Sequence, residues 1–175
     1  SSTSRGLGDV YKRQLLTPRE IIQAGSFGGS YFGEEFLYGD TQYCQLFKDL
    51  FEGIDESLYL TKKYSPKLNQ FKTRSGMGYE YWKEMGWIHD DDPYGWFEWY
   101  CKYSLGRRHE DDDRQIIRWQ NFCGKTGRWK KRIYSRIHET NNWNISPRIQ
   151  QSLLHWGYYA NEYDYDHWKI INKIN

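Results

Sequence analysis

Two short segments combine histidine with several carboxylates and are the first candidates for chemistry. They are His89-Asp90-Asp91-Asp92 and His109-Glu110-Asp111-Asp112-Asp113. Imidazole and carboxylate groups together can bind a divalent cation or act as a general base. On a helix, His109, Asp112 and Asp113 would share one face, so these three are the candidate catalytic residues. An acidic first turn that stabilises a helix N-terminus is the simpler interpretation of the same run.

The sequence contains none of the common catalytic signatures. It has no H-E-x-x-H, no P-loop, no G-x-S-x-G and no dinucleotide-binding fingerprint. Its three cysteines, Cys44, Cys101 and Cys123, include no C-x-x-C pair, which argues against a zinc knuckle or a redox motif. The sequence therefore assigns no metal ligand and leaves any cofactor unknown.

Positive side chains in the central third of the chain form a second set of candidates. Residues 102–136 hold eleven Lys or Arg against four acids, and residues 125–136 hold six Lys or Arg and no acid. Arg128, Arg132 and Arg136 recur every four residues, so on a helix they form one line. Such a row is typical of a surface that binds a polyanion. A solvated face whose charges pair with acids elsewhere fits the same pattern.

An aromatic stripe precedes this basic region. Trp96, Trp99 and Tyr103 lie at helical spacing, and we expect the two tryptophans to belong to the core. The Arg107-Arg108 pair that follows can complement a helix C-terminus or form a bidentate fork for phosphate. The candidates for nucleic-acid binding are Arg107, Arg108, Arg128, Lys131, Arg132 and Arg136 for phosphates, with Tyr94 and Tyr103 for stacking on bases.

Three functions remain open on these residues. A nucleic-acid-binding domain uses the charge segregation and the arginine pair together, so we place it first. An enzymatic version would act on DNA bases or backbone through the aspartates named above. A protein-protein interaction module would use Tyr and Trp anchors in the aromatic loops 27–43 and 142–165. A metal-dependent hydrolase requires His89, His109 and at least two aspartates to converge.

Helix signals predict a mostly α fold, a single compact helical domain with long aromatic-rich loops. Thr17-Pro18-Arg19-Glu20 has the order of a capping box with Pro at the first helical position. Asp92-Pro93 and Ser146-Pro147 mark two further helix starts, and glycine follows several predicted ends. The predicted helices cover residues 18–24, 41–51, 79–85, 93–105, 110–123, 128–138, 147–156 and 163–174.

Composition limits the domain organisation and the partners. The chain has 175 residues, of which 19% are aromatic, and a net charge of +2. Residues 1–14 resemble a translated sequencing-adapter remnant, and we set them apart as a non-native leader, which leaves one domain over residues 15–171. The remaining positive and negative charges balance. No apolar run approaches the roughly 18 residues of a membrane span, and no secretory signal is present. We therefore expect no membrane partner and an intracellular location, cytoplasmic or nuclear.

Six sequence blocks stand out between residues 15 and 158. They read F-G-G-S-Y-F, Y-W-K-E-M-G-W-I, G-W-F-E-W-Y, G-R-R, D-D-D-R-Q-I-I-R-W and S-P-R-I-Q-Q-S-L-L-H-W-G. In this order they resemble a widespread protein family with no assigned activity. The resemblance implies that this range is one intact unit, and it transfers no function.

Overall fold

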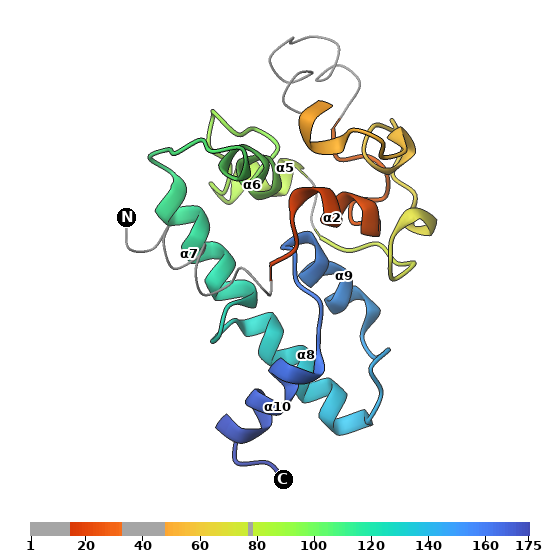
Figure 1. Ribbon diagram of the computed structural model, residues 1–175, viewed down its shortest axis with the longest axis vertical. Coiled ribbons are helices and arrows are strands. Elements are labelled where there is room, and N and C mark those ends of the chain that lie inside the picture. Colours follow the sequence, from red (N-terminus) through yellow and green to blue (C-terminus); the bar gives the residue numbers. More distant parts are fainter. Residues whose placement is uncertain (1–14, 33–47, 77–78) are drawn as a thin grey trace.

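Seven α-helices lie wholly within the residues that the computed structural model describes, which are 15–32, 48–76 and 79–175 (Figure 1). Two 3-10 turns, Glu56–Leu58 and Pro66–Leu68, lie between the first two helices. No strand occurs in these ranges, so the expectation of a mostly helical fold is confirmed. The helices are α2 (Pro18–Ala24), α5 (Tyr79–Glu84), α6 (Trp96–Ser104), α7 (Asp112–Cys123), α8 (Arg128–Thr140), α9 (Pro147–His155) and α10 (Glu162–Ile171).

Local signals locate the ends of α2 correctly. The Thr17 side chain accepts a hydrogen bond from the backbone N–H of Glu20, and the Glu20 carboxylate accepts one from the backbone N–H of Thr17. Gly25 ends the helix at a φ of 82°, a left-handed conformation that favours glycine. The helix predicted over residues 41–51 lies largely outside the described residues, of which 48–51 are helical.

Asp92 does not cap α6, so this part of the prediction is wrong. The helix begins at Trp96 rather than at Pro93. Its N-cap residue is Gly95, which has no side chain to cap the helix. The buried Asp92 carboxylate forms hydrogen bonds with Arg107 instead. Hydrogen bonds to charged groups contribute about 1.5–3 kcal/mol, against about 1 kcal/mol for a helix cap. The interior ion pair therefore determines the position of this side chain.

A tryptophan-rich core joins the central helices. Trp96 and Trp99 of α6 are buried, as their helical spacing predicts, and Trp119 of α7 is fully buried. Trp119 Nε1–H donates to the carbonyl of Trp156 at 2.8 Å. Helix α7 packs on α6 and α8, and α8 also packs on α9 and α10. These contacts give the loops around α6 and the outer side of α8 a rigid support.

The segment before α2 contacts the end of α9. The backbone N–H of Leu16 donates to the carbonyl of Gly157 at 2.8 Å, and the Tyr100 hydroxyl donates to the carbonyl of Leu16 at 2.7 Å. Helix α2 itself packs on α6. These contacts connect the beginning of the described chain to its C-terminal half.

A buried polar network holds α10 against α8. The Tyr158 hydroxyl donates to Asp164 Oδ2 at 2.6 Å and is hydrogen-bonded to the Tyr134 hydroxyl. Lys130 Nζ lies 3.3 Å from the same carboxylate oxygen. Lys130 is one of the six basic residues in the segment 125–136, and this contact neutralises it inside the fold.

Candidate functional site

Arg107 is paired with a carboxylate inside the fold. Its guanidinium donates from Nη1 to Asp92 Oδ1 at 2.9 Å and from Nη2 to Asp92 Oδ2 at 2.6 Å. Asp92 is fully buried, and its Oδ1 also lies 3.0 Å from Lys102 Nζ. This is the bidentate geometry that the sequence pattern suggested for phosphate. The Arg107 fork is therefore already occupied by a carboxylate of the same chain.

Arg108 closes the C-terminal end of α6. Its Nη1 donates to the carbonyls of Tyr103 at 3.1 Å and Arg107 at 2.8 Å. The guanidinium carbon lies 3.9 Å from the centre of the Tyr103 ring. A cation is favoured both at a helix C-terminus and over an aromatic face. These contacts support the helix-end interpretation of the arginine pair.

The two tyrosines predicted to stack on bases are half-buried among other groups. The Tyr103 ring centre lies 5.0 Å from that of Trp99, and Arg108 covers the ring. The Tyr94 ring centre lies 5.9 Å from that of Phe32. Their surroundings are typical of aromatic packing rather than of an open stacking surface.

Asp112 forms part of the start of α7. Its Oδ1 accepts from Trp99 Nε1–H at 2.8 Å, and its Oδ2 accepts from the backbone N–H of His109 at 2.9 Å. Because α7 begins at Asp112, His109 precedes the helix, and the predicted helical face of His109, Asp112 and Asp113 does not form. Asp113 is exposed, whereas both Asp112 oxygens accept hydrogen bonds that stabilise the fold.

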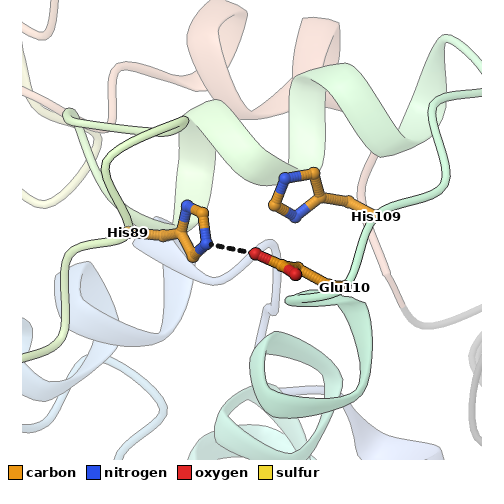
Figure 2. A group of neighbouring side chains, drawn as sticks. All are labelled: His89, His109 and Glu110. Atoms are coloured by element: carbon orange, nitrogen blue, oxygen red, sulfur yellow. Dashed lines mark hydrogen bonds and ion pairs between the residues drawn. The ribbon is translucent and has the colours of Figure 1, made fainter.

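Different residues converge where the two histidine-containing loops meet (Figure 2). The ring centres of His89 and His109 lie 4.8 Å apart, with an angle of 87° between the rings. His89 Nε2 is 3.2 Å from Glu110 Oε1, and His109 Nε2 is 2.7 Å from Asp91 Oδ2. We call these four residues the histidine–carboxylate cluster. The two histidines meet as the hydrolase hypothesis requires, but their partners are one aspartate and one glutamate.

Backbone groups determine which nitrogen of each ring carries the proton. The N–H of Asp91 donates to His89 Nδ1 at 3.0 Å, and the N–H of Asp111 donates to His109 Nδ1 at 3.1 Å. A neutral imidazole has one donor and one acceptor nitrogen, so both rings carry their proton on Nε2, facing the carboxylates. The hydrogen bond with His109 holds the pKa of Asp91 below its usual range. Each histidine thus bridges its own loop to a carboxylate of the other loop.

Four cations at the beginning of α8 are exposed, and we call them the α8 basic face. No carboxylate oxygen of the described chain lies within 4.0 Å of the charged nitrogen atoms of these side chains. The opposite side of the helix is buried through Ile133, Tyr134 and Ile137. The α8 basic face consists of Lys125 in the preceding turn and Arg128, Lys131 and Arg132 on the helix.

Arg136 does not belong to this face. Its Nη1 lies 3.1 Å from Glu139 Oε2, and its Nε donates to Ser146 Oγ at 3.4 Å. Lys125, which begins the basic segment 125–136 but is not among the candidate phosphate contacts of the sequence, is exposed instead. The turn between Gly124 and Gly127 is closed by a 2.9 Å backbone hydrogen bond and leaves Lys125 outside. Gly124 and Gly127 are the sequence signal for this turn, and therefore for the exposure of Lys125.

The aromatic loops proposed as protein anchors mostly fold inward. Phe27, Phe32 and Tyr158 are buried, and residues 33–43 lie outside the described residues. Tyr163 is 68% exposed, and it is the one strongly exposed ring in the described part of these loops. Within the described part of these loops, support for the protein-interaction alternative is limited to this ring, and the alternative stays a prediction.

Glu98 is a buried carboxyl group that the sequence patterns did not single out. It has no exposed surface, and its Oε1 accepts from the backbone N–H of Tyr94 at 3.1 Å. Burial raises the pKa of Glu98 to about 7, although Lys102, 3.2 Å from Oε2, acts in the opposite direction. The available signal was the i,i+4 spacing of Glu98 and Lys102 beside the aromatic stripe. Because no surface is exposed, we assign Glu98 a place in the core rather than a catalytic role.

We expect Glu98→Gln to stabilise the protein above neutral pH and to have little effect at pH 4. The raised pKa means that the folded protein binds the Glu98 proton more tightly than the unfolded chain does. The stability that this protonated carboxyl contributes is therefore lost as pH rises from 4.5 to about 7. That interval corresponds to roughly 3 kcal/mol. Gln retains an acceptor for Tyr94 and has no charge to bury. Urea unfolding at a series of pH values should show the two proteins diverging over this interval.

His155 changes the pH dependence of stability in the opposite direction to Glu98, over nearly the same pH interval. Burial lowers the pKa of His155 from 6.5 to about 4, so its contribution is lost as pH falls through about 4. Both proteins share this contribution, and it cancels when they are compared at the same pH. If their stabilities differed by a constant amount at every pH, Glu98 would have an ordinary pKa.

Comparison with known proteins identifies no relative. No family model, no curated protein and no solved structure matches the chain. Within the described residues, no helix combines the length and apolar character needed to cross a lipid bilayer. The fold and site define a mostly helical protein with an exposed cationic helix face and a histidine–carboxylate cluster. The family resemblance of the sequence blocks stays a prediction.

Proposed function

We propose that the protein binds nucleic acid through backbone phosphates, using the α8 basic face. The observation that carries this proposal is the exposure of four cations without carboxylate partners among the described residues, on a helix whose other side is buried. Residues three and four apart on a helix have Cβ atoms about 5–6 Å apart, so Arg128, Lys131 and Arg132 form a compact group. A compact positive group on a rigid support suits the closely spaced charges of a nucleic-acid strand.

The position of these cations is unfavourable for the fold by itself. The N-terminus of a helix carries partial positive charge, and each nearby cation costs about 0.3–1 kcal/mol. Helix α8 has no acid in its first turn, where the exposed Arg128 and Lys131 lie, whereas α7 begins with Asp112 and Asp113. A bound polyanion would relieve this repulsion. A binding role therefore accounts for the arrangement better than a solvated face does.

We assign binding alone and no bond-breaking step. Asp112 accepts hydrogen bonds with both oxygens, and His109 faces Asp91. The enzymatic version, in which these aspartates act on DNA bases or backbone, consequently has less support than binding. A nucleic-acid partner agrees with the expected intracellular location, cytoplasmic or nuclear.

The salt dependence of oligonucleotide binding tests this proposal. Each phosphate contact contributes about −0.9 to the slope of log K against log salt for duplex DNA, and about −0.7 for single strands. Four contacts therefore predict slopes of about −3.6 and −2.8. Fluorescence anisotropy between about 50 and 200 mM salt would measure both. A slope near zero, or no binding at the lowest salt, would contradict the proposal.

A further inference from the structure

We infer that the histidine–carboxylate cluster binds a divalent transition-metal ion of the Zn²⁺ type. Ligand atoms of His89, His109 and Glu110 all lie within 4.8 Å of one another (Figure 2). Asp91 contacts the same two histidines. This site is separate from the α8 basic face. Helix α7, about 18 Å long at 1.5 Å per residue, lies between Glu110 and α8.

The donor atoms select the class of ion. Two imidazoles and a carboxylate suit Zn²⁺ and neighbouring transition metals, whereas Mg²⁺ and Ca²⁺ prefer oxygen ligands. Ligands bound tetrahedrally at about 2.0–2.2 Å lie about 3.3 Å from one another. His89 Nε2 and Glu110 Oε1 are already 3.2 Å apart. This pair needs almost no movement to share one ion.

The histidine side chains of the cluster are more buried than its carboxylates, which suits a metal site at the surface. The side chains of His89 and His109 are 25% and 15% exposed, so the surrounding loops hold the rings in place. The side chains of Glu110 and Asp91 are 80% and 59% exposed. These carboxylates can change rotamer to complete the coordination without disturbing the core.

Metal binding changes the hydrogen bonds of both rings. At His89 the ion takes the Nε2 lone pair that faces Glu110, so the ring proton moves from Nε2 to Nδ1. There it meets the backbone N–H of Asp91, which now donates to His89 Nδ1. His109 turns Nδ1 toward Glu110 (Figure 2), so an ion bound there displaces the hydrogen bond from the backbone N–H of Asp111, while Nε2–H stays on Asp91. The hydrogen bond is lost or the ring turns over, at a cost of about tenfold in affinity for each ring. We therefore expect a dissociation constant of about 1–10 µM, weaker than that of a structural zinc site.

Calorimetric titration of tag-free protein with ZnCl₂ tests this site, and the visible absorption of added Co²⁺ reports its coordination. A Cys44→Ser background removes a thiol that lies outside the described residues. We expect one ion per chain, and Co²⁺ bands of a four- or five-coordinate nitrogen and oxygen site.

Glu110→Gln separates metal binding from the hydrogen bonds of the cluster. Its amide oxygen still accepts from His89 Nε2–H, so the metal-free fold and melting temperature stay unchanged, while the anionic ligand is lost. We expect Zn²⁺ affinity to fall at least about tenfold. His89→Asn and His109→Asn should each abolish stoichiometric binding. His138→Asn, at an exposed histidine of α8, is the matched control and should bind as the wild type does.

Two results would overturn this inference. One is the absence of stoichiometric Zn²⁺ uptake by folded, tag-free wild-type protein. The other is wild-type affinity in both Glu110→Gln and His109→Asn. In either case the cluster would only bridge the two loops through hydrogen bonds.

Discussion

Asp92→Asn is expected to lower the free energy of unfolding by about 3–5 kcal/mol. Asp92 is fully buried, and its carboxylate neutralises both Arg107 and Lys102. Asn retains the size of the side chain and one acceptor, but it leaves two partly buried cations without this negative charge. Glu98 offers Lys102 one contact at 3.2 Å, whereas the ion pair of Arg107 in the described chain is with Asp92, so Glu98 cannot replace Asp92 for both.

Urea unfolding followed by circular dichroism measures this loss. Asp90→Asn makes the same chemical change at an exposed neighbour and should stay within about 0.5 kcal/mol of wild type. The double variant Asp92→Asn/Arg107→Met should recover much of the loss, because the uncompensated charge is the main cost. A loss below about 1 kcal/mol in the single variant would show that Arg107 is readily solvated.

Reversing three charges of the α8 basic face is expected to lower nucleic-acid affinity about a thousandfold at 0.1 M salt. Each phosphate contact contributes about 0.9 decades of affinity at this salt concentration relative to 1 M. Arg128→Glu/Lys131→Glu/Arg132→Glu therefore removes nearly three decades. The introduced acids lie near the N-terminus of α8, where the helix dipole favours them, so stability should equal or exceed that of wild type. Lost binding with retained stability would show that these cations serve a ligand.

A matched charge reversal at other surface positions distinguishes binding at the α8 basic face from attraction of nucleic acid to the net charge of the protein. Lys63→Glu/Lys67→Glu/Lys83→Glu alters the net charge equally, at exposed lysines away from α8. We expect this variant to lose less than about tenfold in affinity, because only the overall field changes. Equal losses in the two triple variants would indicate attraction to net charge alone. Wild-type affinity in the α8 variant would exclude the α8 basic face as the binding site.

The sequence by itself determined most helices and their buried faces. The capping box at Thr17, the Pro at the start of α9 and the spacing of Trp96 and Trp99 act within one or two helical turns. Helical periodicity also places Arg128 and Arg132 opposite the buried side of α8. Such features depend on local geometry, which a sequence pattern records directly.

Only the tertiary structure decided which charged groups have partners. No local pattern distinguishes Arg107, which Asp92 neutralises, from Arg132, which is exposed without a carboxylate partner in the described chain. The sequence likewise indicated two histidine-containing segments but not that His89 would face Glu110. These contacts join the loops on either side of α6, and the packing of a whole helix sets their distances. A sequence pattern can count such charges, but only the packed core brings particular ones within reach of each other.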